Sequence, residues 1–440
     1  MQYSVYYNTM PDGTVKQVNP FTGNEVWAVP GRAARPHRNG AAITPVPIER
    51  IDRDAACAFC AKRQFEVTPE KSRWMQTEGG WREVVDLPAA AYLSTPYTFR
   101  RIANLFEIVP LEYWKRNYDY RTPHEEMERL EHYAATPEGL EHLRAVVEYK
   151  RRSLLNGRVT QRDPLDHDTL IAESEPFYGG CHELIVAHDH YRRDAQTDAD
   201  LLSTGQLTPD EHAIYMRATV DALQAILHRN RYVRYVSVFQ NWLAPAGASY
   251  DHLHRQLVGI DEWGASIIRQ VKMLKKNPNV FNEYGANLAS LYNLVIAEND
   301  HALAFVGIGH RFPTIEIYSK STNDRPWEHS PEEMAAMSDL VHACHAATGP
   351  EVSCNEEWYY TPVDAIVKMP WHVLIKWRIS VPAGFEGGTS IHINPMTPIE
   401  LRDRLVPKLY EMRDTGRVRN VLIAEECRLT PNALQYYHNS

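Results

Sequence analysis

Two spacings of hydrophobic and polar residues alternate along the chain, and they predict helices and strands in turn. Residues 209–228 place apolar side chains three and four positions apart, with Thr208 able to cap the helix and Glu211 three residues later; this is a capping-box pattern. Residues 232–239 instead alternate and are rich in β-branched and aromatic side chains, which predicts a strand. A Pro/Gly/Ala turn then leads into a second predicted strand, residues 252–260.

The same order of elements recurs in the second part of the chain. The elements predicted there are a helix at 262–276, strands at 302–308 and 314–318, a helix at 331–347 and a strand within 364–379. Further helices are predicted at 122–152, 398–413 and in the last fifteen residues. We therefore expect two α+β halves, residues 1–260 and 261–440, with a helical insertion at about residues 120–155.

Composition and charge narrow the class of protein. The 440 residues are 44% hydrophobic and 23% charged, values typical of a globular protein. Lys and Arg number 47 and Asp and Glu 56, a net charge of −9 that argues against bulk binding to nucleic acid or anionic lipid. No apolar run approaches the ~20 residues of a membrane span, and the first residues do not resemble a signal peptide. We expect a cytoplasmic protein without a nucleic-acid or membrane partner.

The segment with the clearest chemical pattern is residues 247–257. Alternate side chains share one face of a strand, so His252, His254 and Gln256 are expected to point the same way. Two imidazoles and an amide behind a Gly/Ser turn suit attack on phosphorus, in which a neutral His nitrogen attacks while amide and hydroxyl groups donate to the phosphoryl oxygens. The alternative is a partly exposed strand that carries two histidines by coincidence.

A second signal is the Cys-x-x-Cys pair of Cys57 and Cys60, which has the spacing of a zinc knuckle. No other such pair exists in the sequence, so a tetrahedral site needs histidine ligands. Spacing does not choose among the candidates, which are His182, His188, His190 and His252. A pair of core thiols is the alternative interpretation.

Further motifs occur in order along the chain. They are residues 19–23 (Asn-Pro-Phe-Thr-Gly), the loop 31–36 with two arginines, residues 101–106, residues 180–190, residues 239–241, His372, residues 383–389 and residues 393–395. Together with the cysteine pair and the His252-x-His254-x-Gln256 strand, these motifs resemble the galactose-1-phosphate uridylyltransferase family of the histidine-triad superfamily.

The resemblance implies two histidine-triad-like halves with mainly antiparallel sheets flanked by helices, and a homodimer whose active sites receive residues from both subunits. It implies a structural Zn²⁺ ion held by Cys57, Cys60, His190 and His252. It assigns His254 as the nucleophile and places Gln256, Ser249 and Asn241 on the phosphates. It also implies nucleotide contacts from Arg32, Arg35 and Asn104, and hexose contacts from Phe385 and Glu386.

The activity implied by the resemblance is transfer of UMP between a UDP-hexose and a hexose 1-phosphate through a nucleotidyl-histidine, as in galactose metabolism. Gln256 stands where the hydrolases of the superfamily generally have a third His, which favours transfer. Nucleotide-sugar phosphorylases share the Gln, and a non-catalytic nucleotide-binding protein is a further alternative. Pro370, two residues before His372, replaces a His of many relatives and argues against an additional metal site. Arg255 replaces a small residue and is expected to be an outward side chain.

Overall fold

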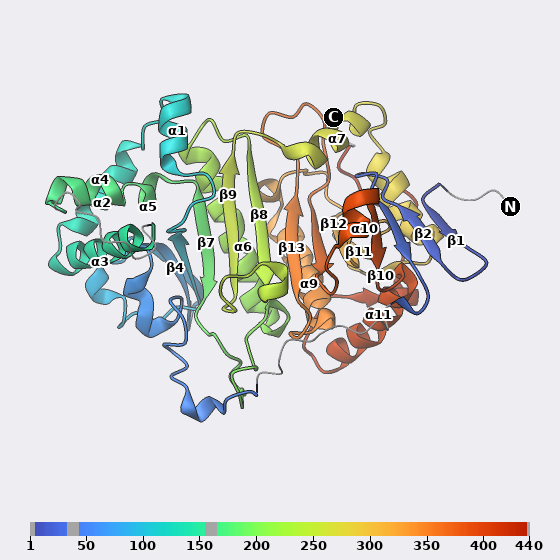
Figure 1. Cartoon of the computed structure of the whole chain (residues 1–440), viewed down its shortest axis with the longest axis horizontal. Helices are drawn as coiled ribbons and strands as arrows, with labels where there is room; N and C mark the ends of the chain where they lie inside the picture. The colour runs from blue at the N-terminus through green and yellow to red at the C-terminus, as the bar shows by residue number, and fades with distance from the viewer. Residues whose placement is uncertain (1–4, 33–43, 155–164, 438–440) are drawn as a thin grey trace.

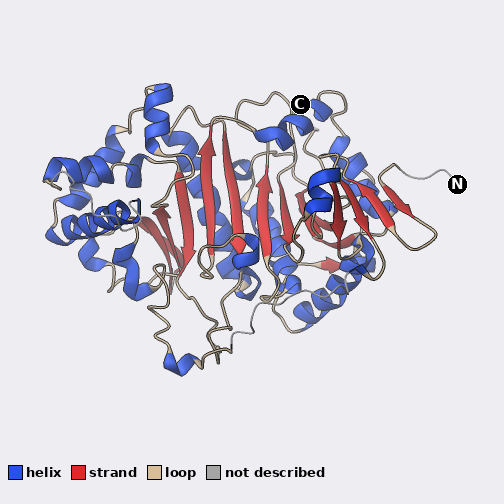
Figure 2. Ribbon diagram, in the orientation of Figure 1, coloured by secondary structure: helices blue, strands red, loops and turns tan. Residues whose placement is uncertain are grey.

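A computed structural model describes residues 5–32, 44–154 and 165–437, and these residues form an α+β fold (Figures 1 and 2). In this part of the chain the central sheet has twelve strands, and every neighbouring pair in it is antiparallel. From one edge to the other the strands are β16 (Leu422–Ile423), β10 (Val295–Glu298), β11 (Ala302–Val306), β12 (Thr314–Ser319), β14 (His372–Trp377), β13 (Cys354–Tyr359), β8 (Tyr235–Trp242), β9 (His254–Ile260), β7 (His182–Ala187), β6 (Phe99–Ala103), β4 (Glu70–Thr77) and β5 (Gly80–Val85).

The strand order is symmetric about the central pair β8 and β13. Outward from this pair, β9, β7 and β6 follow on one side, and β14, β12 and β11 follow on the other. Phe239 of β8 and Glu357 of β13 are register partners at the centre. We call the strands β4 to β9 the N-terminal half of the sheet and β10 to β14 its C-terminal half.

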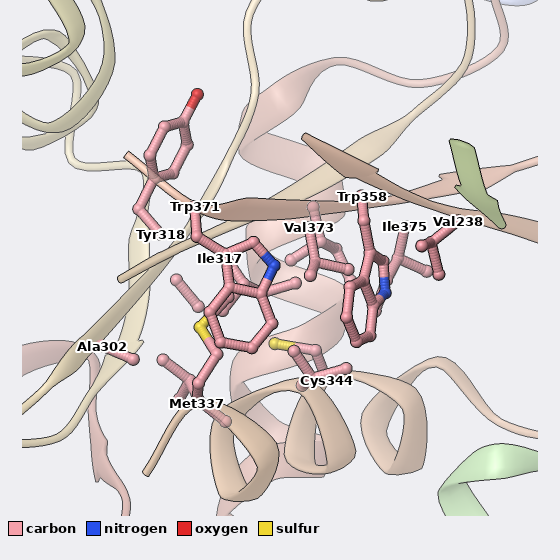
Figure 3. Close-up of a cluster of buried hydrophobic side chains, with 14 of the residues drawn as sticks. Val238, Ala302, Ile317, Tyr318, Met337, Cys344, Trp358, Trp371, Val373 and Ile375 are labelled. Carbon is pink, nitrogen blue, oxygen red and sulfur yellow. The ribbon is translucent and has the colours of Figure 1, made fainter. Parts of the chain in front are cut away.

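Three helices pack on one face of the sheet: α6 (Pro209–Arg229), α9 (Pro331–Thr348) and α11 (Pro398–Asp414). The capping box predicted for α6 is present, because the Glu211 N–H donates to Thr208 Oγ1 at 3.2 Å and the Thr208 N–H donates to the Glu211 carboxylate at 2.8 Å. Figure 3 shows how α9 is held: Met337 and Cys344 face Trp358 and Trp371 of the C-terminal half. The tight packing of these apolar side chains fixes the helix on the sheet.

A small second sheet pairs three strands from the first thirty residues with one strand from late in the chain. Its order is β1 (Tyr7–Thr9), β2 (Val15–Val18), β3 (Glu25–Ala28) and β15 (Ile391–Asn394), and β3 and β15 are parallel. The sheet packs on the C-terminal half, where Asn19 Nδ2 donates to the Ile308 carbonyl at 2.8 Å and the Phe21 ring stacks on Phe281. The short helix α10 (Gly384–Thr389) precedes β15 and lies in front of β11 and β12 in Figure 1.

Five helices lie between β6 and β7 at the opposite end of the molecule (Figure 1): α1 (Leu111–Tyr118), α2 (His124–Ala134), α3 (Pro137–Leu154), α4 (His167–Ser174) and α5 (Pro176–Gly179). Leu130, Leu143 and Phe177 are among the buried residues that give them a core of their own. The charged segment predicted to be helical, residues 122–152, forms α2 and α3.

The remaining helices connect these units. They are α7 (Gly264–Leu274), α8 (Asn287–Leu291) with the π-helical turn Asn282–Ala286 before it, and 3₁₀ helices at Ile48–Arg50, Ala61–Glu66, Ala89–Ala91, Thr204–Gln206, Ala244–Ala246, Pro326–Glu328 and Ala424–Glu426.

The helix predicted in the last fifteen residues was wrong for their described part, up to residue 437. The Leu434 N–H donates to Asn282 Oδ1, and Asn282 Nδ2 donates to the Leu434 carbonyl, both at 2.9 Å. Because both backbone groups of Leu434 bond to this side-chain amide, they are not available for helical hydrogen bonds, and residues 427–437 form turns and irregular structure.

Candidate active site and metal centre

Strand β9 presents different side chains to its two faces. His254 and Gln256 point to the face opposite α6, which we call the open face, whereas Arg255 points to α6 and donates from Nη1 to Thr219 Oγ1 at 3.0 Å. The strand begins at His254, so His252 lies in the loop before it. The alternation expected from the sequence therefore holds for His254 and Gln256, whereas the prediction that His252 belongs to the same strand was wrong.

His254 is buried and its ring orientation is fixed by the backbone. Nδ1 lies 2.7 Å from the His252 carbonyl oxygen, which can only accept, so Nδ1 carries the proton and Nε2 keeps its lone pair. Desolvation lowers the pKa of His254 to about 4, so the ring is neutral at pH 7. Among the described residues Nε2 has no hydrogen-bond partner.

His182 orients the side chain of Gln256. The sequence had suggested His182 only as one of four candidate metal ligands. The Ile108 N–H donates to Nδ1 of the buried His182 at 3.1 Å, so the proton of the neutral ring is on Nε2. His182 Nε2 then donates to Gln256 Oε1 at 3.2 Å. Asn104 Nδ2 lies 3.0 Å from the same Nε2, but both atoms are donors in this tautomer, so no hydrogen bond forms between them. With Oε1 engaged, the Gln256 amide group is left to donate to a ligand.

Four side chains close to His254 have the geometry of a metal site. The ligand atoms of Cys57, Cys60, His190 and His252 all lie within 4.8 Å of one another, and all four residues are buried. The two sulfurs are 3.8 Å apart, and the sulfur-to-Nδ1 distances in the cluster are 3.4, 3.4 and 3.7 Å. Tetrahedral zinc with ordinary bond lengths needs about 3.8 Å between sulfurs and about 3.6 Å between sulfur and nitrogen. The cluster can therefore hold a metal ion of this size.

A hydrogen bond to the backbone orients the imidazole of His252 so that it can bind a metal ion. Its Nε2 donates to the Ala187 carbonyl at 2.7 Å, which leaves the Nδ1 lone pair for a metal. The other two candidate ligands are engaged elsewhere, since His182 contacts Gln256 and His188 Nδ1 lies 2.7 Å from Asp189 Oδ1. The tertiary structure thus selects His190 and His252 from the four histidines.

Two further predicted residues surround the turn before β9. Ser249 is exposed on this turn. Asn241, near the end of β8, accepts at Oδ1 from Asn355 Nδ2 at 2.8 Å. Its own Nδ2 faces Gly247, where an added Cβ would lie 3.9 Å away. Gly247 has φ +89°, a conformation that side chains other than glycine rarely adopt, so the sharp turn requires glycine here.

The remaining predicted ligands form a separate pocket of about 320 Å³. Arg32, Phe385 and Glu386 line it together with apolar side chains of Val29, Ile379 and Val381. This pocket belongs to α10 and the small sheet, on the C-terminal half, whereas His254 lies on β9 across the central pair of strands (Figure 1). Arg35 lies outside the described residues.

The expectation that Arg255 is an outward side chain was wrong. Arg255 is completely buried, and its guanidinium forms an ion pair with Glu356 of β13 at 2.8 Å. It also lies over the Tyr215 ring, 4.1 Å from the ring centre. The reason is that helix α6 covers this face of the sheet, while Glu356 of β13 supplies the carboxylate that a buried guanidinium needs.

The fold and the site together define a two-halved α+β protein with a Cys₂His₂ cluster beside a backbone-anchored histidine. The chain belongs to the family described as domain of unknown function DUF4921, whose sequence model matches residues 10–436. A sequence comparison with curated proteins gives no match.

Two solved structures are similar to this one. An ADP-glucose phosphorylase from Arabidopsis thaliana with bound ADP-glucose has a TM-score of 0.55 and 16% identity, covering 89% of this chain and 98% of its own. A GalT-like protein from the same plant has a TM-score of 0.51 and 17% identity, covering 80% of this chain and 92% of its own. At these identities the similarity establishes the fold. None of the helices in the described part of the chain has the length and apolar character needed to cross a membrane.

Proposed function

We propose that the protein is a nucleotidyltransferase that works through a nucleotidyl-His254 intermediate. The observation that carries the proposal is the hydrogen bond from His254 Nδ1 to the His252 carbonyl, which directs a lone pair on Nε2 to the open face. Nε2 attacks the α-phosphorus of a nucleotide sugar, a P–N bond forms, and the P–O bond to the departing sugar phosphate breaks. A phosphate oxygen of the acceptor then attacks the same phosphorus and releases neutral His254.

Two side-chain amides support this chemistry. Gln256 and Asn241 each have their amide oxygen engaged within the protein, by His182 and Asn355, so their NH₂ groups can donate to phosphoryl oxygens as negative charge develops. We assign Ser249 to the same task from its place in the turn. Asn104 is proposed to contact the nucleotide.

A Zn²⁺ ion in the Cys57, Cys60, His190 and His252 cluster is proposed to be structural, since four protein ligands leave no position for water. When bound, it would fix the loop that contains His252, and the carbonyl of His252 holds the nucleophile. Loss of the metal is therefore expected to displace His254.

For the reaction itself we favour transfer of UMP between a UDP-hexose and a hexose 1-phosphate. Phosphorolysis of a nucleotide sugar is the second candidate, and it is supported by the similarity to a structure described as an ADP-glucose phosphorylase over 98% of that chain's length. Both reactions share the first step at His254 and differ in the acceptor.

Incubation with labelled UDP-glucose or ADP-glucose tests these proposals. A covalent label that passes to galactose 1-phosphate supports transfer, and passage to inorganic phosphate supports phosphorolysis. Binding without a covalent label would contradict the nucleotidyl-enzyme and favour a non-catalytic nucleotide-binding protein.

We further propose that the chain divides near residue 260 and that two copies pair to complete each site. The pocket of Arg32, Phe385 and Glu386 lies on the other half of the sheet from His254, and its exposed apolar side chains, with Phe385 47% and Val381 78% exposed, suit a covering partner.

Mixing two inactive variants tests this pairing. If sites are shared, an equal mixture of His254→Ala and Glu386→Ala subunits regains about a quarter of the native activity, because half of the dimers carry one intact site. No recovery after the subunits have exchanged would show that each chain builds its site alone.

A further inference from the structure

A pocket with a volume of about 510 Å³ lies on the open face where the two halves of the sheet meet. Its walls come from β8 and β13, from the first turn of α7 and from the residue that follows β14. Figure 1 shows β8 and β13 side by side at the centre of the sheet. The polar and aromatic side chains in the wall include Asn241, Asn355, Glu357, Tyr359, Trp263 and Arg378.

Arg378 brings a positive charge to this pocket. Its Nη1 donates to Asn355 Oδ1 at 2.7 Å, and its guanidinium lies over the Phe312 ring, 4.5 Å from the ring centre. Its Nε is buried without a hydrogen-bond partner, and no carboxylate of the described residues lies within 4.0 Å of the guanidinium. A half-buried guanidinium with free donors is suited to a carboxylate or phosphate ligand.

Among the described residues that form the wall, Glu357 is the one acidic side chain, and it is already neutralised. Glu357 forms an ion pair with Lys376 at 2.5 Å and accepts from the Tyr359 hydroxyl at 2.7 Å. Both partners contact Oε2, and Oε1 has no hydrogen bond within the described chain. Arg378 therefore gives the pocket a net positive charge, and Oε1 is left to accept from a ligand hydroxyl.

The start of α7 adds to the positive potential. Gly264, Ala265 and Ser266 line the pocket, and the N-cap residue of this eleven-residue helix, Trp263, makes no capping hydrogen bond with its side chain. Backbone N–H groups at such an end favour an anion. The wall therefore suits an anion that also carries hydroxyl groups and an apolar face: Arg378 can bind the anionic group, Glu357 can accept from a hydroxyl, and aromatic side chains can cover the apolar face.

Hydrogen bonds link the pocket to the chemistry proposed at His254. Arg378 bonds to Asn355, and Asn355 Nδ2 bonds to Asn241 Oδ1, so the C-terminal half of the chain sets the amide orientation of Asn241. Phe239 in the pocket wall is the register partner of Gln256 on the nucleophile strand. A ligand in the pocket would lie beside the phosphoryl group that His254 carries.

We infer that this pocket binds the sugar phosphate of the reaction, with Arg378 on its phosphate and Glu357 Oε1 on a sugar hydroxyl. The identity of the ligand as the acceptor rests on the proposed function. The acceptor's phosphate oxygen would then face the phosphorus on His254, and its attack forms the new P–O bond as the P–N bond breaks.

Binding to a protein that cannot turn over tests the inference separately from the reaction. Glucose 1-phosphate and inorganic phosphate are titrated into His254→Ala protein by calorimetry, alone and combined with Arg378→Met. We expect Arg378→Met to raise the Kd for both ligands by about tenfold or more, because a charged hydrogen-bond donor is lost. Arg378→Lys should recover part of the affinity. Arg417→Met, in a second polar pocket on the chain, is the matched control and should bind normally.

Glu357→Gln separates sugar from phosphate recognition. Glu357→Gln should weaken the binding of glucose 1-phosphate relative to that of inorganic phosphate, because the substitution removes the acceptor for the sugar hydroxyl and leaves Lys376 without its carboxylate for both ligands alike. The inference is overturned if folded Arg378→Met protein, checked by its melting curve, binds both ligands normally, or if neither ligand binds to the His254→Ala protein. If Arg378 governs binding but the native enzyme forms no covalent label, the pocket assignment stands and the proposed function fails.

Discussion

His254 and His372 occupy equivalent positions in the two halves of the sheet and are held by the same backbone contact. Each Nδ1 donates to the carbonyl oxygen of the residue two positions earlier, His252 at 2.7 Å and Pro370 at 2.8 Å. The neighbouring strands differ, because the register partner of His372 on β12 is Tyr318, which stacks on its ring at 4.5 Å. Thus the same arrangement leaves Nε2 of His254 without a partner among the described residues in one half and packs the His372 ring against Tyr318 in the other.

The first prediction follows from this pair. His254→Ala should abolish the covalent label from a nucleotide sugar, because no other nitrogen replaces Nε2. His372→Ala is the matched control: it should lower the melting temperature, since it opens a cavity beside Tyr318, but should retain the label per folded molecule. Mass spectrometry of the intact protein after incubation measures both. Normal labelling of His254→Ala would remove this residue as the nucleophile.

Gln256→Ala should slow formation of the nucleotidyl-enzyme by about 10²–10³, the usual effect of losing one donor to a developing oxyanion. His182→Ala should slow it less, because it only releases the Gln256 amide from its orientation. The double variant should be no slower than Gln256→Ala alone, since both act through one amide. Single-turnover kinetics give the three rates, and additive effects would show that His182 acts by another route.

The metal centre predicts one tightly bound zinc per chain after purification without added metal. Cys60→Ala should lose the metal and with it the covalent label, because the loop that carries His252 is released. Cys427→Ala, a partly exposed thiol away from the cluster, is the control and should keep the metal. Elemental analysis decides, and an active, folded chain without metal would refute the assignment.

Acid should destabilise the protein through buried neutral histidines such as His142. Its Nε2 donates to the Val67 carbonyl and its Nδ1 accepts from the Tyr133 hydroxyl, and burial lowers the pKa of His142 to about 4. Between pH 6.5 and pH 4 the unfolded chain takes up a proton that the folded chain does not, so stability falls as pH falls through this window and is unaffected above it.

The contribution of His142 can be isolated. The free energy of unfolding of the native protein should fall by about 2 kcal/mol between pH 7 and pH 5 on account of this residue, and His142→Gln should remove that part of the slope. His132→Gln, an exposed substitution on α2, should leave the slope as it is. Urea unfolding at both pH values is the measurement, and equal slopes in all three proteins would contradict the assignment.

The buried ion pair between Arg255 and Glu356 predicts a large stability effect at the position next to His254. Arg255→Met should cost about 3–5 kcal/mol, because the Glu356 carboxylate is left buried without its guanidinium. Arg217→Met breaks an exposed pair with Asp221 and should cost about 0–1 kcal/mol. Urea unfolding compares the two variants, and similar small losses would show that His345 and Trp358 satisfy the Glu356 carboxylate without Arg255.

What the sequence determined by itself is local. The capping box at Thr208 and the spacing of apolar residues predicted α6 to within one residue of its observed end, because both act within a few residues. The alternation in β9 placed His254 and Gln256 on one face for the same reason. The Cys57 and Cys60 spacing likewise predicted two members of the cluster that could hold a metal ion, since a four-residue turn brings both sulfurs together.

The tertiary structure decided everything that depends on residues far apart in the chain. Spacing did not distinguish His190 from His182 and His188 as a ligand, because that choice depends on where β7 places each ring beside the cysteines. The pairing of β8 with β13 joins the two halves, supplies Glu356 to Arg255 and builds the central pocket around Arg378. Local pattern cannot reveal these contacts, since each forms only when segments more than a hundred residues apart pack together.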